Sequence, residues 1–147
     1  MARLGTLQTT EAVLAAFVSE LSREPETGES FVPLVAVKKF SRRKLGDLNS
    51  VLNAAQLPAG VVVYDGSGYQ RGRAPTRLAR VAVVVRVPAQ GDPEATAVDA
   101  RAQMDACRDR LDEHTFGNAV VYAQTDGVVE SRDGSINYFV TFQVWDH

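Results

Sequence analysis

Hydrophobic and polar residues alternate most regularly in residues 77–87, RLARVAVVVRV. Every second position from Ala79 to Val87 is apolar, whereas the positions between them include two arginines. Because successive side chains of a strand point to opposite faces, this pattern predicts a β-strand with one fully buried face. Pro88 ends the strand because proline lacks a backbone N–H group. We expect this segment to be the central strand of a sheet.

The other strands are predicted from β-branched and aromatic runs that lie between turn residues. They span residues 31–37, 60–65, 119–124, a brief 128–130 and 135–145. Thr125-Asp126-Gly127 predicts a turn before the brief segment, and Asp133-Gly134 predicts the hairpin turn before the last strand. The glycine-rich residues 66–76 predict a long loop before the central strand, of the kind that often carries function.

Apolar residues at helical spacing predict three helices, over about residues 10–21, 47–55 and 93–111. Thr9 or Thr10 can cap the first, and Asp92 followed by Pro93 is a strong start signal for the third. Together, these elements predict a single α+β domain over residues 1–147. We expect a mostly antiparallel sheet of four to five strands with the helices packed on one face.

Charged residues are segregated along the chain, although the formal net charge is only -2. Residues 11–29 and 92–113 are mainly acidic, whereas the middle of the chain is basic. The basic residues include a cluster at positions 38–44 and a group in the glycine-rich segment: Lys38, Lys39, Arg42, Arg43, Lys44, Arg71 and Arg73. Such a chain can present a positive surface and a negative surface on the same subunit.

The composition indicates a globular protein, with 45% hydrophobic and 23% charged residues. The first residues lack the uncharged apolar core and small-residue cleavage site of a signal peptide, and no apolar run is long enough to cross a membrane. One cysteine, Cys107, cannot form an internal disulfide, which fits a reducing compartment. We therefore expect synthesis in the cytoplasm and no membrane partner.

The residue types of catalysis and metal binding are sparse. Cys107 could act as a nucleophile with His114, but its helical spacing from Met104 and Leu111 favours a buried structural thiol. His114 and His147 are the only imidazoles, so a transition-metal site would need carboxylates for most of its ligands. We expect no enzyme activity, no metal and no cofactor.

Three polar patterns have both a functional and an ordinary interpretation. The third helix carries carboxylates that alternate with arginines, which favours a solvated helix face over an acid/base pair. The glycines of residues 66–72 match no common phosphate-binding motif. The basic cluster KKFSRRK could grip nucleic acid, but the acidic chain lacks stacking aromatics, so we favour a solvated or protein-binding surface.

Four segments carry a resemblance to a known family: LPAGVVVYDGSG, the valine-rich strand that ends in VP, the helix VDARAQMDACRDRL, and the terminal DGSINYFVTFQVWDH. In this order, over residues 9–147, the chain resembles the small tail-terminator or tail-completion proteins of tailed bacteriophages. It is most similar to the family found in Mu-like prophages with contractile tails.

The resemblance implies a virion structural protein that forms a six-membered ring at the head-proximal end of the tail tube. Such a ring ends tube polymerisation and joins the tail to the head connector, so the expected partners are further copies of the chain, tail tube and sheath proteins, and the connector. DNA passing through the ring would contact it transiently.

The expected contact surfaces combine the basic cluster with the glycine-rich segment. They comprise Lys38, Lys39, Arg42, Arg43, Lys44, Tyr69, Arg71 and Arg73. Two alternatives stay open from the sequence, namely a head–tail neck adaptor and a small monomeric or dimeric module that binds a ligand or peptide. An enzyme whose site the sequence does not reveal is a third.

Overall fold

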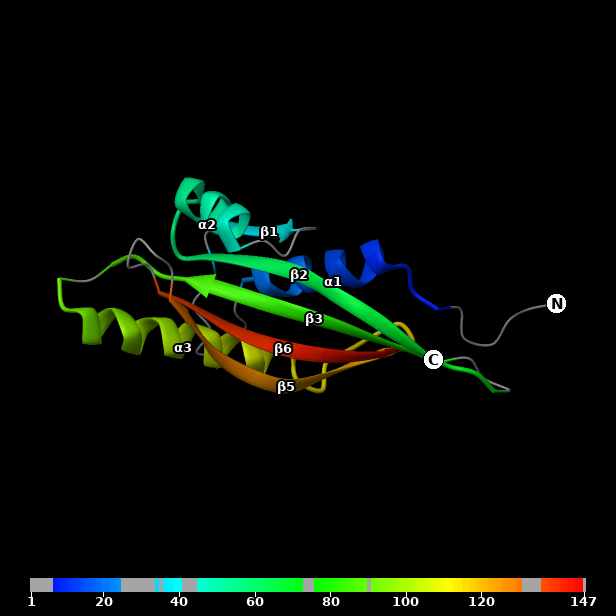
Figure 1. Cartoon of the computed structure of the whole chain (residues 1–147). Coiled ribbons are helices and arrows are strands. Elements are labelled where there is room, and N and C mark those ends of the chain that lie inside the picture. Colours follow the sequence, from blue (N-terminus) through cyan, green and yellow to red (C-terminus); the bar gives the residue numbers. More distant parts are fainter. Residues whose placement is uncertain are drawn as a thin grey trace.

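The computed structural model describes residues 7–24, 34, 36–40, 45–72, 76–89, 91–130 and 136–146. Within these residues the elements follow the order α1 (Thr10–Ser22), β1 (Ala36–Phe40), α2 (Leu45–Ala54), β2 (Ala59–Gln70), β3 (Thr76–Arg86), α3 (Pro93–Leu111), β4 (Thr115–Phe116), β5 (Ala119–Glu130) and β6 (Ile136–Asp146). The strands form one curved sheet flanked by the helices (Figure 1). The fold is therefore α+β, as predicted.

The sheet has six described strands in the order β1-β2-β3-β6-β5-β4, so β3 and β6 lie in its middle. This confirms the predicted central strand. The expectation of four to five mostly antiparallel strands is corrected at both edges. At one edge, β4 is a short strand of two residues that was not among the predicted strands. At the other, β1 runs parallel to β2 because the connection between them contains a helix and can return the chain to the same end.

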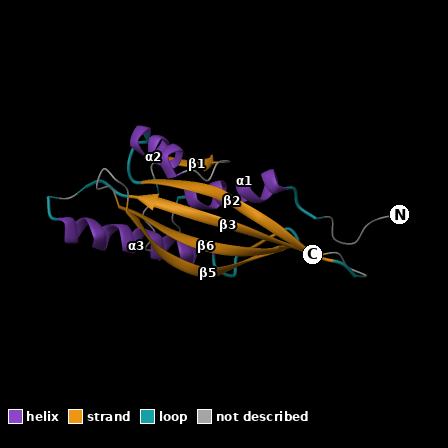
Figure 2. Cartoon of the chain, viewed as in Figure 1, coloured by secondary structure: helices purple, strands orange, loops and turns teal. Residues whose placement is uncertain are grey.

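The helices do not all lie on one face of the sheet, which corrects a second expectation. Val62 of β2 belongs to the main core beneath α1 and α3, whereas its neighbours Val61 and Val63 pack with Leu52 of α2. Neighbouring residues of a strand face opposite sides, so α2 covers the other face from α1 and α3 (Figure 2). The continuous apolar run GVVV provides this burial on both faces.

The main core is centred on β3 and β6. All five positions of the predicted apolar row are buried, four in β3 from Ala79 to Val85 and Val87 just after its end. On β6, Phe142 is completely buried and its ring meets that of Phe17 of α1 in an edge-to-face contact, with centroids 5.5 Å apart. This geometry is favourable for aromatic pairs. The contact fixes α1 against the centre of the sheet.

The helix boundaries follow the predicted capping signals. Thr9 Oγ1 accepts a hydrogen bond from the Ala12 backbone N–H at 3.1 Å, and Asp92 Oδ1 accepts one from the Glu94 N–H at 3.1 Å. Both side chains satisfy amide groups that the first turn of a helix leaves without partners. Pro93 occupies the first turn of α3, as predicted. The helix α2 begins at Leu45, two residues before the predicted start.

The predicted long loop at residues 66–76 is wrong, because β2 continues to Gln70 and pairs with β3 as far as Thr76. The pairing is irregular between Tyr64 and Ser67, where Gly66 has a φ of 101°. Glycine reaches this left-handed region without steric cost, so the glycine-rich sequence forms a bulge instead of a loop.

The predicted turn at Thr125-Asp126-Gly127 is wrong for the same reason. β5 is one strand from Ala119 to Glu130, with an irregularity between Ala123 and Thr125. β6 pairs with β5 along this whole length, so the turn-forming sequence forms a bulge within the strand. The predicted Asp133-Gly134 turn lies outside the described residues, and β5 and β6 pair antiparallel as expected.

The first strand begins later than predicted. β1 spans Ala36–Phe40, whereas residues 31–37 were expected, and residues 31–33 and 35 lie outside the described part of the chain. Lys38 and Lys39 therefore belong to the strand and do not follow it.

At the opposite end of the sheet, Arg77 of β3 and Asp146 of β6 form a buried ion pair at 3.7 Å. Asp146 also accepts a hydrogen bond from the Gln8 backbone N–H.

Candidate assembly interface

The predicted contact residues that the structure describes fall into two separate places. Lys38 and Lys39 lie on the edge strand β1, which pairs with β2 only as far as Phe40 opposite Val63. Tyr69 is six residues further along β2, which is about 20 Å at the rise of an extended strand. The structure therefore does not join the two groups into one patch. The remaining predicted residues lie outside the described part of the chain: Arg42, Arg43, Lys44 and Arg73.

The two lysines of β1 are exposed and point to different faces of the sheet. Lys39 lies on the face of α1, where its Nζ is 3.0 Å from Glu11 Oε2. The side chains of this pair are 46% and 75% exposed, so water screens their attraction and the pair contributes little to stability. Both lysines are accordingly accessible for contacts with another molecule.

The paired ends of β2 and β3 carry the second group. Tyr69 is 67% exposed, and Arg71 follows two residues later. These ends lie beside the C-terminal end of β6, where Arg77 is opposite Asp146 (Figure 1). An exposed aromatic side chain at the paired ends of two strands has the residue type that protein interfaces favour.

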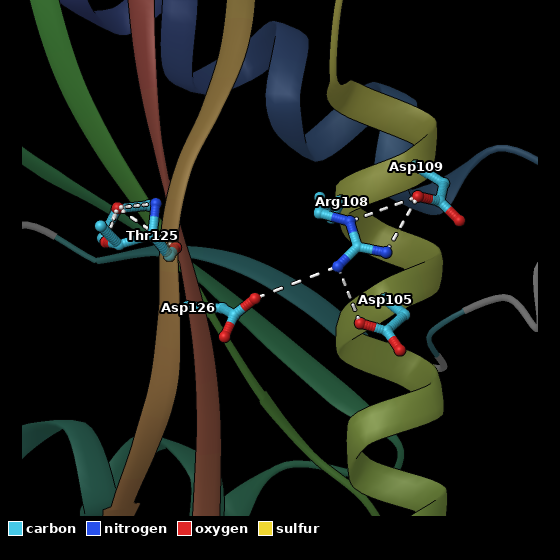
Figure 3. A network of polar contacts seen from close by, with 6 residues as sticks. Asp105, Arg108, Asp109, Thr125 and Asp126 are labelled. Carbon is cyan, nitrogen blue, oxygen red and sulfur yellow. Dashed lines mark hydrogen bonds and ion pairs between the residues drawn. The ribbon is translucent and has the colours of Figure 1, made fainter.

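A cluster of acidic residues lies near the opposite edge of the sheet, between α3 and β5 (Figure 3). Arg108 is surrounded by three carboxylates, with nitrogen-to-oxygen distances of 3.0 Å to Asp105, 3.2 Å to Asp109 and 4.0 Å to Asp126. Three negative charges face one positive charge, so the cluster is negative overall. We call Asp105, Asp109 and Asp126 the acidic cluster.

The acidic cluster further stabilises the charged form of Arg108. Partial burial lowers the pKa of Arg108, and the Asp109 hydrogen bond with the neighbouring carboxylates raises it by more, so the net pKa is raised. A cleft with a volume of about 190 Å³ lies beside Arg108. Its lining residues come from α3, β5 and β6: Arg108, Ala123, Gln124, Thr125, Asp126 and Val140.

Sequence reasoning identified the exposed carboxylates of α3 but missed the contribution of Asp126. Asp126 was assigned to a turn, whereas the bulge of β5 directs it toward α3 (Figure 3). Asp112, which caps the C-terminal end of α3, makes a different kind of contact. Its Oδ1 accepts from the Ala123 backbone N–H at 2.8 Å and so holds the end of α3 against β5.

A second polar cluster, also missed, lies under α2. The Arg86 guanidinium donates to the side-chain oxygens of Asn137 at 2.8 Å, Asn53 at 2.5 Å and Asn49 at 2.9 Å. Arg86 and Asn137 are buried. Because these residues come from β3, β6 and α2, the cluster joins α2 to the sheet. Its position beneath a helix indicates a structural role.

Cys107 is completely buried, which agrees with the favoured structural interpretation. Burial raises the pKa of its thiol to about 12, with a smaller opposing effect of Arg110, so the reactive thiolate is scarce near neutral pH. His114 lies with its Nε2 3.9 Å from Glu20 Oε2. His147 lies outside the described residues.

The fold and its surfaces define an α+β domain that carries lysines at one sheet edge and an acidic cluster near the other. No group of histidine, cysteine or carboxylate side chains suited to a metal ion is found in the described part of the chain. Among the described helices, none combines the length and apolarity required to cross a membrane. No protein family model matches the sequence, and a search of curated proteins gives no significant match.

Proposed function

We propose that this protein forms a ring at the head-proximal end of a phage tail tube, where it ends polymerisation of the tube and joins the tail to the head connector. The observation that carries this proposal is the opposite charge at the two sides of one sheet. Lys38 and Lys39 lie on β1, and the acidic cluster lies beside β5. The resemblance to tail-terminator proteins supplies the class of assembly.

Opposite charges at opposite sides of a subunit favour a heterologous interface, in which one surface meets a different surface of the next copy. Interfaces of this kind close into a ring when each copy is rotated by a constant angle about one axis. A self-complementary dimer would instead bring like charges together at each of these surfaces. The charge distribution therefore supports a cyclic assembly, and the resemblance suggests six subunits.

The paired ends of β2 and β3 are our proposed contact for a partner along the tail axis, either the tube or the connector. They carry the exposed Tyr69, with Arg71 two residues later. Sheath proteins would lie around the ring, and DNA would pass through it transiently. The protein would thus be part of the virion tail or neck after synthesis in the host cytoplasm. A neck adaptor would use the same surfaces.

The cleft found among the described residues gives little support to the ligand-binding alternative. The cleft beside Arg108 has a volume of about 190 Å³, whereas pockets for small molecules usually measure about 300–1,000 Å³.

Light scattering across a range of protein and salt concentrations tests the proposed ring. The expected particle has a mass of about 95 kDa, six times the 15.9 kDa of one chain. Its population should fall as salt is raised, because salt screens the charges at its interfaces. A mass of one chain at every concentration, both alone and with tail-tube protein present, would contradict the proposal.

A further inference from the structure

Two edges of the sheet leave strand positions without a described neighbour. β1 ends the strand order on one side. On the other side, β4 pairs only with Ala119 and Val120, so the described strands leave the outer edge of β5 open over residues 124–130. Open edges present backbone N–H and C=O groups that readily pair with another chain.

The open part of β5 is suited to such pairing. Thr125 directs its N–H toward Thr141 of β6. Since the backbone groups of an antiparallel strand alternate in direction, the N–H and C=O groups of Asp126, Val128 and Glu130 point outward. Val128 is 55% exposed, and residues 124–130 contain neither the proline nor the lysine with which natural edge strands often prevent pairing.

The charges beside the two edges lie on the same face of the sheet. Lys39 of β1 contacts Glu11 of α1, and Asp126 of β5 contacts Arg108 of α3. Because α1 and α3 pack on one face, Lys39 and the acidic cluster share that face. If β5 met β1 of another copy, Lys39 would therefore lie on the side of the acidic cluster.

The strand directions also match. β1 is parallel to β2, and the successive pairs β2–β3, β3–β6 and β6–β5 are all antiparallel, so β1 and β5 run in opposite directions. A second copy that continues the sheet in the same orientation consequently presents its β1 antiparallel to β5. The helix faces of the two copies then lie on the same side.

From these observations we propose that the open edge of β5 pairs with the outer edge of β1 in a second copy of this chain, with Lys39 of that copy facing the acidic cluster. The sheet then continues from subunit to subunit. This inference rests on the proposed ring and names its interface. An interface of β5 with β5 would instead give closed dimers and place two acidic clusters together.

Cross-linking tests which edges meet. The variant combines Lys39→Cys on β1 with Val128→Cys on β5, two exposed positions that face the same side of the sheet, and is treated with a short bismaleimide. The buried Cys107 should stay unmodified, so wild-type protein treated with the same reagent should show no linked chains. The expected result is a ladder of linked chains that ends at six.

Matched controls separate the possible pairings. Each single cysteine variant should give no ladder, and the pair Lys39→Cys with Tyr122→Cys should link poorly, because Tyr122 is exposed on the other face of β5. Dimers from Val128→Cys alone would overturn the inference in favour of pairing between two β5 edges. A 95 kDa particle (about six chains) without any ladder would overturn the edge pairing and leave the ring intact.

A charge exchange gives a second test that does not depend on cysteines. Lys39→Glu and Asp126→Lys should each reduce assembly at low salt by about tenfold or more, and combining them should restore most of it. A purely structural role of either residue would not produce this rescue. Equal losses in the single and double variants would overturn the inference. A single-chain mass together with no cross-link would overturn both the interface and the ring.

Discussion

Replacing Phe142 with Ala is expected to lower the free energy of unfolding by about 3–5 kcal/mol, the usual range for truncating a buried aromatic residue. Phe142 is completely buried on the central strand β6, and its ring contacts Phe17 of α1. Truncation removes this apolar contact and leaves a cavity between α1 and the sheet. Because close-packed cores relax only partly, the cavity adds to the lost burial.

Urea unfolding followed by circular dichroism measures this change. Tyr122→Ala is the matched control, because Tyr122 is an exposed aromatic residue on the neighbouring strand. Exposed substitutions usually change stability by about 0.5 kcal/mol or less. A loss below about 1 kcal/mol for Phe142→Ala would contradict the position of this ring in the core.

Arg86→Met is expected to destabilise the protein by about 3 kcal/mol, because hydrogen bonds to charged groups contribute about 1.5–3 kcal/mol each and are not additive. The substitution keeps a long side chain but removes the donors to Asn49, Asn53 and Asn137. The buried amide of Asn137 then loses a partner in a place that water reaches poorly. Since α2 supplies two of the three asparagines, its attachment to the sheet should weaken most.

Hydrogen exchange locates the effect within the chain. The backbone amides of α2 should lose protection in Arg86→Met, beyond the general loss caused by lower stability. Arg80→Met is the matched control, because Arg80 lies on the same strand and is exposed. Equal stability of the two variants would contradict the assigned role of the Arg86 cluster.

The elements whose conformation depends mainly on neighbouring residues in the sequence could be predicted. Thr9, Asp92 and Pro93 define the starts of two helices by chemistry that acts within one turn. The apolar row of β3 is decided by burial of one face, so its period reveals the strand. The central position of that strand follows from how completely its row is apolar.

The elements whose conformation depends on pairing or packing with distant parts of the chain could not be predicted. A sequence such as Asp126-Gly127 is compatible with both a turn and a continued bulged strand, and the choice depends on how far β6 extends beside it. The same holds for Gly66 beside β3. Local sequence also does not indicate which face of a sheet a short amphipathic helix covers, so the placement of α2 was wrong.

The candidate interface was predictable only from charge. The basic residues near Lys39 are visible as a cluster in the sequence, and the carboxylates of α3 are visible as an acidic stretch. Asp126 joins those carboxylates from another element, which no sequence spacing reveals. The Arg86 cluster likewise connects residues 33 to 51 positions apart. Such contacts depend on topology.

Polymerisation of tail-tube protein in the presence of this chain tests the central claim most directly. Electron microscopy should show tubes that stop growing and carry a sixfold ring at one end, whereas tubes grown without the protein should continue to lengthen. The number of capped ends should rise with the amount of protein added until every tube is capped. Tubes of unchanged length with bare ends, at a protein concentration well above that of the tubes, would contradict the proposed function.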